Sequence, residues 1–322
     1  MTIYFDNNAT TRPHPEVVTI IREHLESTWG NPSSVHHPGR LARRAIEEAR
    51  EQIALLIGAE PSEIIFTSGG TESNNAAIFG RAAGSVPERF HIVTTTIEHP
   101  SVRAVVAALE SRGCPVSWVS PDSSGKVSAD DVIGAIEDST SLVTVMTANN
   151  ETGVVQPVAE VSRACRDRGI PFHTDAVQAI GKIPVIVEQM PVDSLALSAH
   201  KFYGPKGIGA LYVRKGSAME PFVLGGSQER RRRGGTENVP LAAGIGKAAE
   251  LAAGELDRQD SIRALRDDLE RKVTASIANV VVNGGDAAKV TLPEGDWSVT
   301  FASEAGTATV EGTTLSVDWQ TV

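Results

Sequence analysis

Between about residue 40 and residue 215, the sequence alternates between segments with a helical period and short apolar runs that are typical of strands. The helical period is clearest in segment 41–58, whose apolar residues share one face and which Gly58 ends. These apolar residues are Ala42, Ile46, Ala49, Ile53 and Leu56. Because strands that alternate with helices form largely parallel sheets covered on both faces, we predict an α/β fold of this kind.

Polar residues cluster directly after five of the predicted strands. The clusters are Gly69–Gly70–Thr71, Glu98–His99, Asn149–Asn150, Asp175 with Gln178, and Ser198 with His200 and Lys201. The carboxyl ends of parallel strands meet at one edge of a sheet, where the ligands of open α/β sheets bind. We therefore expect these five clusters to line a single ligand crevice.

The cluster in "FTSGGTESNN" places two glycines between a predicted strand and a predicted helix. Backbone N–H groups at such a helix start can bind phosphate, although a tight turn alone would also explain the glycines. A phosphate cup, the amine of Lys201 and the carboxylate of Asp175 together suit pyridoxal phosphate. Taken singly, Asp175 could cap a helix, His99 could be a core histidine and Gln178 a surface residue. Their common placement favours the cofactor.

The composition argues against several classes of protein. The chain has 322 residues and a net charge of −10, which is unlike a nucleic-acid binder, and 22% charged residues, which is typical of soluble globular proteins. We interpret the basic run Arg230–Arg233, taken alone, as a solvated loop or an anion contact. Two distant cysteines, Cys114 and Cys165, predict neither a disulfide framework nor a metal site, so we expect a cytoplasmic protein. The sequence shows no signal peptide and no apolar run long enough for a membrane helix.

The C-terminal part departs from the alternating pattern. Segment 241–277 is predicted to be helical, with an apolar stripe in its second half. The stripe contains Ile262, Leu265, Leu269, Val273 and Ile277. After Gly285 the composition changes, because residues 290–322 contain no lysine, arginine, histidine or cysteine. The segments "DWSVTF" and "TLSVDW" alternate apolar and polar residues, so we predict an antiparallel hairpin there.

Long motifs in a fixed order run from residue 4 to about residue 284. They are "YFDNNATT", "GNPSSVHHPGRLAR", "FTSGGTESNN", "IEHPSV", "NNETG", "HTDAVQAIGK", "SAHKFYGPKGIGALY" and "GGSQERRRRGGTENV". In these motifs the chain closely resembles the cysteine desulfurases of the NifS/IscS type, in the class V aminotransferase branch of fold-type I pyridoxal-phosphate enzymes. The resemblance implies a mostly parallel sheet flanked by helices and a small second domain.

The resemblance also implies roles for single residues. Lys201 would attach the cofactor, Asp175 would pair with its pyridine nitrogen and Gln178 would reach its phenolic oxygen. His99 would stack on the ring and carry protons, together with Lys201. The remaining implied residues are Gly70, Thr71, Ser198 and His200 for the phosphate, Thr236 for the phosphate of the neighbouring subunit, Asn150 for the ring oxygen or the substrate carboxylate, and Asn8 close by. A homodimer follows from Thr236, and the arginine run becomes part of the shared loop, with Arg231 where the pattern often has glycine.

By resemblance, the chain divides into four parts. They are 1–14, which joins the small domain, 15–250, the large cofactor-binding domain, 251–284, the helical start of the small domain, and 285–322, an atypical β-hairpin tail. The family places its nucleophilic cysteine, within a mobile loop, and an arginine for the substrate carboxylate in this last region, which here contains neither residue type. Neither Cys114 nor Cys165 follows a strand, so we interpret both as structural.

The implied reaction removes sulfur from L-cysteine, leaves L-alanine, and supplies the sulfur, by way of an acceptor protein, to iron–sulfur cluster or thio-cofactor assembly. Three alternatives stay open for a chain without the cysteine loop. The first is desulfuration with an external thiol as acceptor, and the second is a related C–S lyase or aminotransferase. The third is a pyridoxal-phosphate-binding scaffold without catalysis. No nucleic acid or membrane partner is expected.

Overall fold

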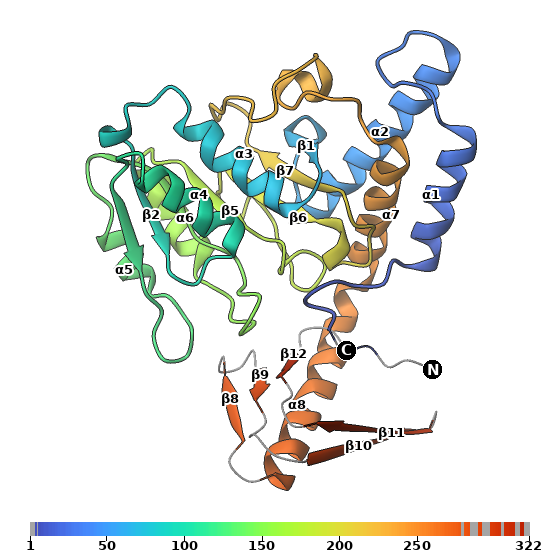
Figure 1. The fold of residues 1–322 in the computed structure, drawn as a ribbon, viewed down its shortest axis with the longest axis vertical. Helices are drawn as coiled ribbons and strands as arrows, with labels where there is room; N and C mark the ends of the chain where they lie inside the picture. Colours follow the sequence, from blue (N-terminus) through green and yellow to red (C-terminus); the bar gives the residue numbers. More distant parts are fainter. Residues whose placement is uncertain are drawn as a thin grey trace.

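A seven-stranded sheet forms the centre of the molecule in the computed structural model (Figure 1). The structure describes residues 4, 6–277, 280–283, 289–291, 297–303, 306–312 and 316–318. The strands are β1 (Ile64–Thr67), β2 (His91–Thr95), β3 (Val116–Val119), β4 (Thr140–Thr144), β5 (Phe172–Asp175), β6 (Ser194–Ser198) and β7 (Gly209–Val213), in the order β1-β7-β6-β5-β4-β2-β3. Within this sheet only β7 runs antiparallel to its neighbours, so the predicted largely parallel sheet is confirmed.

Helices cover both faces of this sheet. The helices are α1 (Pro15–Ser27), α2 (His37–Ile57), α3 (Gly70–Ala82), α4 (Pro100–Glu110), α5 (Ala129–Gly134), α6 (Val158–Asp167), α7 (Val239–Glu255) and α8 (Gln259–Ser276). Helices α2, α6 and α7 pack on one face and α3 and α4 on the other, whereas α1 packs against α7. The helix predicted at 41–58 is α2, and a capping residue defines each of its ends. The His36 side chain accepts the N–H of Gly39 at the start of α2, and Gly58 ends the helix with a φ of 66°.

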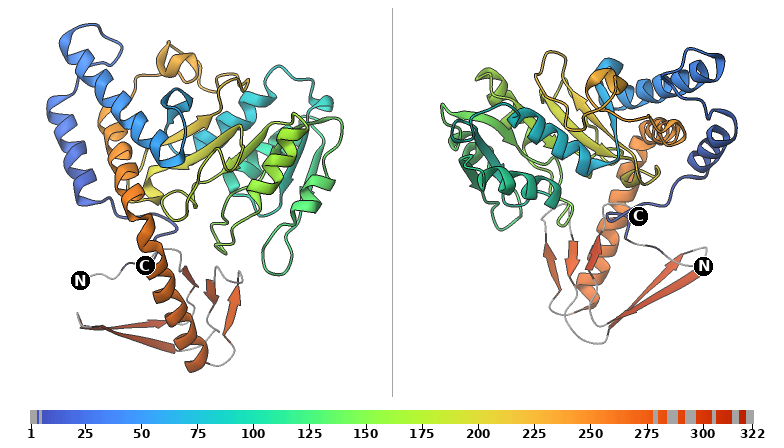
Figure 2. Two further views of the ribbon diagram at one scale, coloured as in Figure 1. Left: turned by 180° about the vertical axis from the view of Figure 1, so that it is seen from behind. Right: turned by 45° about the horizontal axis from the view of Figure 1, so that its top comes forward.

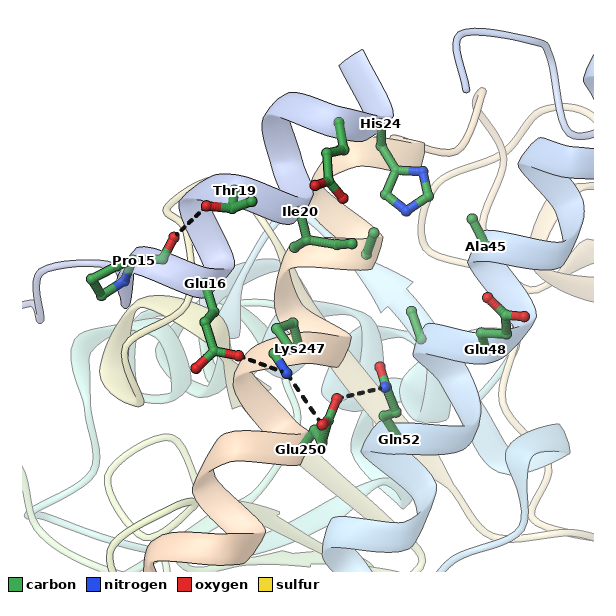
Figure 3. Close-up of a pocket in the computed structure, with 13 residues that line it drawn as sticks. Pro15, Glu16, Thr19, Ile20, His24, Ala45, Glu48, Gln52, Lys247 and Glu250 are labelled. Atoms are coloured by element: carbon green, nitrogen blue, oxygen red, sulfur yellow. Dashed lines mark hydrogen bonds and ion pairs between the residues drawn. The ribbon is translucent and has the colours of Figure 1, made fainter. Parts of the chain in front are cut away.

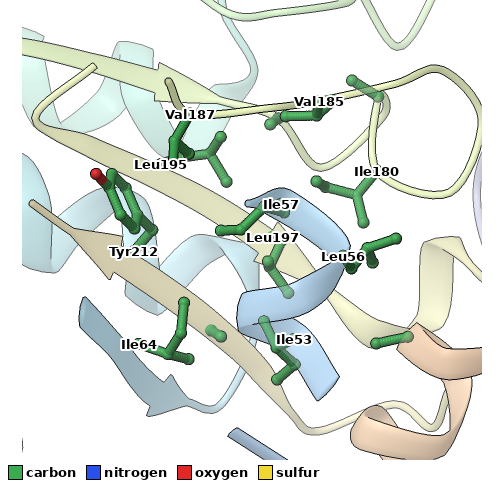
Figure 4. Close-up of a cluster of buried hydrophobic side chains, with 14 of the residues drawn as sticks. Ile53, Leu56, Ile57, Ile64, Ile180, Val185, Val187, Leu195, Leu197 and Tyr212 are labelled. Atoms are coloured by element: carbon green, nitrogen blue, oxygen red, sulfur yellow. The ribbon is translucent and has the colours of Figure 1, made fainter. Parts of the chain in front are cut away.

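Successive side chains of a strand point to opposite faces of the sheet, so in a sheet covered on both faces they pack into the core on alternate sides. Ile64 and Tyr212 pack on the side of α2, α6 and α7, whereas Ile65 and Leu211 pack with residues of α3 on the other side. Figure 4 shows α2 with Ile53 and its neighbours against the strand residues of the first side. The predicted stripe of α2 is fully part of this core, since each of its five members is 7% exposed or less.

The C-terminal helices continue from α7, which packs against α1 and α2. Figures 1 and 2 show α8 extending beyond the large sheet, with short strands beside it. The predicted stripe of α8 is only partly buried, because Val273 is 5% exposed and Leu265 is 61% exposed. No helix in the described ranges is both long and apolar enough to cross a bilayer.

The predicted pairing of the tail strands is wrong. Strand β10 (Trp297–Ser303) forms its hairpin with β11 (Gly306–Gly312), whereas β12 (Ser316–Asp318) pairs with β9 (Lys289–Thr291), which also pairs with β8 (Val281–Asn283). The hairpin brings Ser303 opposite Gly306. So short a connection costs less loop-closure entropy than pairing "DWSVTF" with the more distant "TLSVDW". The four-part division of the chain stays a prediction.

Candidate active site

Lys201 lies just past the carboxyl end of β6, in the short helical turn Ala199–Lys201. Its Nζ atom donates hydrogen bonds to the backbone carbonyl of Asn8 and, at 3.0 Å, to that of Ala9. The segment around Asn8 therefore crosses the end of the sheet and covers the lysine. The Nδ2 atom of Asn8 is buried and has no hydrogen-bond partner among the described residues. An amide donor is thus held beside Lys201 in a position to bind a ligand.

Asp175 ends the neighbouring strand β5 and is 4% exposed. Its Oδ1 atom accepts the N–H of Val177 at 2.9 Å, and its Oδ2 atom accepts the amide of Asn74 at 2.6 Å. Burial raises the pKa of Asp175, while these two hydrogen bonds and the nearby His99 and Lys201 oppose the rise. A carboxylate in this position can pair with a cationic ring nitrogen.

His99 follows β2 and caps α4, where its Nδ1 atom lies 2.7 Å from the hydroxyl of Ser101. The preceding Glu98 is 3% exposed, and its Oε1 atom accepts the hydroxyl of Thr95 and the N–H of Met146, both at 2.8 Å. Burial raises the pKa of Glu98 to about 8, so this side chain is largely protonated at neutral pH. His99 is thus the titratable side chain of this cluster that stays partly exposed.

The start of α3 lies against the end of β6 and the first residue of β7. A Cβ atom at Gly209 would lie 2.7 Å from the Cα atom of Gly69, so this approach of two backbones requires glycine. A Cβ atom at Gly70 would lie 3.7 Å from the Cβ atom of Ser198. The Ser198 side chain and the first N–H groups of α3 therefore belong to one corner, which is suited to an anion and which includes Thr71 as the second residue of the helix.

His200 joins this corner to the N-terminal segment. Its Nδ1 atom lies 3.1 Å from the Thr10 hydroxyl, and its carbonyl accepts the N–H of Thr11 at 2.8 Å. Burial lowers the pKa of His200 to about 4, and the charges of Lys201 and Lys206 add to this effect. The imidazole is therefore neutral at neutral pH and acts through hydrogen bonds rather than charge.

Gln178 follows β5 and is 4% exposed. Its Nε2 atom donates to the carbonyl of Asn8 at 3.1 Å, and its Oε1 atom accepts from Lys182 at 2.6 Å. Through Asn8, the glutamine is therefore connected to the same backbone carbonyl that holds Lys201.

The arginine run lies in a loop with a short helical turn, Gln228–Arg231. Arg231, where the family pattern often has glycine, has a φ of 66°. A left-handed conformation of this kind favours glycine and explains the pattern. Arg233 donates to Glu72 at 2.9 Å, and Glu72 in turn accepts the N–H of Ser68 beside the glycine turn. The loop is thereby attached to the anion corner, while the prediction that this site is shared between subunits stays a prediction.

Two of the predicted site residues, Asn150 and Thr236, are not connected to this group by the hydrogen bonds described within a single chain. Asn150 donates to its neighbour Glu151 at 2.9 Å, and Thr236 is exposed. Asn149 instead connects the loops after β4 and β2, because its Nδ2 atom donates to the carbonyl of Ile97 at 2.9 Å. The structure brings the other predicted residues to one edge of the sheet, namely Asn8, Gly70, Thr71, His99, Asp175, Gln178, Ser198, His200 and Lys201.

Sequence reasoning missed three residues that hold this group together. They are Asn74, Ser101 and Lys182. Asn74 and Ser101 lie inside the quoted motifs "FTSGGTESNN" and "IEHPSV", and Lys182 follows Gln178 by four residues. Position within a motif was therefore the available signal, while their side-chain partners could not be known without the fold.

A surface groove of about 480 Å³ lies elsewhere, between α1, α2 and α7 (Figure 3). Its polar side chains largely bind one another. Lys247 contacts Glu16 at 3.0 Å and Glu250 at 3.2 Å, and Gln52 donates to Glu250 at 3.2 Å. None of the residues expected to bind the cofactor lines this groove, so it is not the candidate active site.

Comparison with known proteins agrees with this geometry. The model of the class-V aminotransferase family matches residues 3–291. The cysteine desulfurase IscS of Dictyoglomus turgidum is 48% identical over 88% of this chain and 72% of that protein, and a cysteine desulfurase of Nostoc sp. is 49% identical over 88% and 70%. Among solved structures, a NifS-like protein has a TM-score of 0.87 at 38% identity, over 91% of this chain and 82% of the other. SspA in complex with cysteine has a TM-score of 0.83 at 39% identity, over 91% and 84%. The chain therefore belongs to the class-V aminotransferase family, among its cysteine desulfurases.

Proposed function

We propose that this chain removes the sulfur of L-cysteine with pyridoxal phosphate as cofactor, leaves L-alanine, and passes the sulfur to a thiol. The proposal is carried by one observation, the meeting of Lys201, Asp175 and the start of α3 at one edge of the sheet. Two findings on similar proteins support the proposal. The similar sequences are cysteine desulfurases, and the similar structure SspA was solved in complex with cysteine. Pyridoxal phosphate is the cofactor of this family.

The residues present fit this cofactor. The buried Nδ2 atom of Asn8 lacks a partner among the described residues, as expected for a donor that binds a ligand. Asp175 would hold the ring nitrogen, Gln178 the ring oxygen, and Lys201 would attach the cofactor through its amine. The phosphate would lie at the start of α3, with Gly70, Thr71, Ser198 and His200 around it. When bound, pyridoxal phosphate draws electrons from the bonds around the α-carbon of an attached amino acid.

The chain's own side chains would supply orientation and proton transfer. Asp175 would keep the ring nitrogen protonated, because its carboxylate is held by the N–H groups of Val177 and Asn74. Lys201 would move a proton at Nζ, and His99 would move one at its imidazole. Asn8, with Asn150, would contact the substrate. Each of these roles is part of the proposal.

The sulfur step requires a thiolate from outside the described site. As the thiolate attacks, the new S–S bond forms, the bond between Cβ and sulfur breaks, and Cβ takes a proton. Cysteine and a thiol thus give alanine and a persulfide. Both cysteines of the chain are buried and protonated, as their raised pKa values show. We therefore assign the acceptor role to a separate thiol, from a small molecule or an acceptor protein.

We also propose that the chain works as a homodimer in the cytoplasm. The support is the exposed position of Thr236 on a loop whose Arg233 is attached to Glu72 near the anion corner. From there Thr236 would reach the phosphate of the neighbouring subunit.

The test begins with the cofactor. Purified protein supplied with pyridoxal phosphate is expected to show its yellow absorbance, and Lys201→Ala is expected to lose it, whereas the exposed Lys206→Ala keeps it. A colourless wild-type protein would contradict the cofactor assignment. The coloured protein is then given L-cysteine with and without a dithiol, and alanine, pyruvate and sulfide are measured. Alanine that depends on the dithiol supports the proposal. Pyruvate with sulfide and ammonia would indicate a lyase, and no product a scaffold.

A further inference from the structure

Asn74 lies fully buried between two groups of the proposed site. Both hydrogens of its amide are used, because Nδ2 donates to Asp175 Oδ2 at 2.6 Å and to the hydroxyl of Ser101 at 2.8 Å. Its Oδ1 atom lies 3.0 Å from Nε2 of His173. The side chain therefore has three partners, and the carboxylate of Asp175, which only accepts, requires the NH₂ end of the amide to face it.

The donor direction of Asn74 determines the direction of the next bond. An amide NH₂ group only donates, so the Ser101 oxygen accepts from Asn74 and its own hydrogen is left for the Nδ1 atom of His99, 2.7 Å away. The backbone N–H of Ser101 donates to the same Nδ1 atom at 3.1 Å. Nδ1 of His99 thus accepts two hydrogen bonds, and the hydrogen of the neutral ring belongs on Nε2.

His173 is compatible with this orientation of Asn74. The ring is 0% exposed, and burial lowers the pKa of His173 to about 3, so the ring is neutral. One ring nitrogen then donates and the other accepts. Donation from Nε2 to Asn74 Oδ1 leaves Nδ1 to accept the hydroxyl of Ser194 at 2.9 Å. The opposite orientation of the amide would place its oxygen against an oxygen of the Asp175 carboxylate, where two acceptors repel.

We propose that Asn74 is a positioning residue that holds the carboxylate of Asp175 and, through Ser101, keeps His99 in its Nε2–H tautomer. The hydrogen bonds run in one direction, from Ser194 through His173, Asn74 and Ser101 to His99. A neutral ring held in this way presents Nε2–H as a hydrogen-bond donor toward a ligand, whereas taking up a proton at Nδ1 requires both donors of Ser101 to turn away. The link to catalysis rests on the proposed function, but the tautomer is a property of the protein alone.

The substitution Asn74→Asp reverses the direction of the hydrogen bond between residue 74 and the Ser101 hydroxyl, with almost no change in side-chain shape. The carboxyl oxygen in place of the NH₂ group shares one proton with Oδ2 of Asp175, which lies 2.6 Å from Nδ2 in the wild type, and accepts the hydrogen of Ser101. The Ser101 oxygen then faces His99 as an acceptor. The Nδ1 atom of His99 is expected to gain a proton. In Ser101→Ala, Nδ1 loses its shorter donor and keeps the backbone N–H. This milder variant gives a smaller change and does not add a charge to the core.

The tautomer is measured on cofactor-free full-length protein labelled with ¹⁵N-histidine, by correlation of ring nitrogens with ring carbon-bound protons, and His99→Gln assigns the signals. Wild type is expected to show His99 with an unprotonated Nδ1. The Nδ1 resonance should shift toward the protonated position in Asn74→Asp, and should move from its wild-type position in Ser101→Ala. The neighbouring Asn75→Ala removes bonds to the backbone carbonyls of Thr71 and Ser101 but none to the Ser101 hydroxyl or to His99, and should leave the resonance unchanged. A wild-type His99 with its hydrogen on Nδ1, or a resonance that ignores both Asn74→Asp and Ser101→Ala, would overturn the inference.

Cofactor binding is measured separately by visible absorbance with added pyridoxal phosphate. If the tautomer is as expected but no colour forms, the proposed function fails and the hydrogen-bond assignment stands. If colour forms but the tautomer is wrong, the assignment of Asn74 fails and the proposed function stands.

Discussion

The ammonium group of Lys182 lies 2.6 Å from the Oε1 atom of Gln178, in the interior of the protein. An ammonium group has three donors and no acceptor, so the oxygen of the glutamine amide must face it. The NH₂ group of Gln178 then faces the carbonyl of Asn8, 3.1 Å away, on the side of Lys201. A second lysine thus orients the glutamine amide that we expect to contact the ring oxygen of the cofactor.

Substitution of Lys182 by methionine is expected to lower the free energy of unfolding by about 1–3 kcal/mol, because buried acceptors on Gln178 and Asn8 lose their donor. The retention of pyridoxal phosphate should fall as well, since the amide of Gln178 is then free to turn. Urea unfolding and equilibrium dialysis of the cofactor measure the two effects. Lys206→Met is the matched control, because this exposed lysine should change stability by less than about 0.5 kcal/mol. Equal behaviour of the two variants would contradict the role of Lys182.

The buried pair Arg50–Glu229 attaches the arginine loop to the core. Both side chains are 2% exposed, and Nη1 and Nη2 of Arg50 contact the two carboxylate oxygens at 2.8 and 3.0 Å. We expect Arg50→Met to lower the free energy of unfolding by about 3–5 kcal/mol, because Glu229 would be left as an unpaired buried charge. Urea denaturation measures this loss. Replacing both partners together should cost less than the sum of the two single variants, since no unpaired charge remains.

The control for Arg50 lies on the same helix. Arg44 contacts Glu48 at 2.6 Å, but its side chain is 77% exposed. Arg44→Met should therefore change stability by no more than about 1 kcal/mol, as is usual for surface pairs. If the two arginines cost the same, burial of the pair is not what makes Arg50 important.

Glu98 is expected to make stability fall as the pH rises. Its pKa is raised by burial from 4.5 to about 8. Between these values the folded protein keeps a proton that the unfolded chain has lost, so raising the pH favours unfolding by up to about 1.4 kcal/mol per unit. The stabilising contribution is thus complete below about pH 4.5 and is lost as the pH approaches 8. Glu98→Gln has no such proton, and its stability relative to wild type should increase from about pH 5.5 to about pH 7.5 in urea titrations. A difference that is the same at both pH values would contradict the protonated state of Glu98.

The sequence predicted the large sheet and the position of the site because both depend on local patterns. Apolar runs define the strands, and polar residues such as Asp175 and Lys201 follow the strand ends directly. Parallel order then brings these ends to one edge without any knowledge of single contacts. The pattern could not place β7 or the tail strands in the correct order, because strand pairing depends on loop closure and on neighbours far along the chain.

The hydrogen-bond partners of the site residues could not be predicted from the sequence. Asn74, for example, meets Asp175 across 101 residues and Ser101 across 27. Polar side chains of this type are common at helix starts, so sequence alone gives no reason to choose Asn74 over Asn75. Only the fold shows that one is fully buried beside Asp175, whereas the other donates to the nearby carbonyl of Thr71.

The two cysteines of the chain are expected to take no part in sulfur transfer. Cys165 is 0% exposed and Cys114 is 5% exposed. Burial raises the pKa of Cys165 to about 12, and burial together with the charge of Glu88 raises that of Cys114, so neither forms the thiolate that attacks sulfur. Native protein should therefore resist alkylation at both sites, while protein in urea should react twice.

The decisive variant replaces both Cys114 and Cys165 by alanine. We expect it to form alanine from L-cysteine at the wild-type rate, with the same dependence on an added thiol, because the proposed acceptor is a separate thiol. Mass spectrometry of wild-type protein after exposure to L-cysteine should show no gain of a sulfur atom on either residue. Loss of alanine formation in a folded double variant, or a persulfide on Cys114 or Cys165, would show that one of these thiols reaches the site after a movement of the chain. Since Cys165 lies within α6 and Cys114 is buried in the core beside α4, such a movement would require local unfolding, and its rate should then rise with low concentrations of urea.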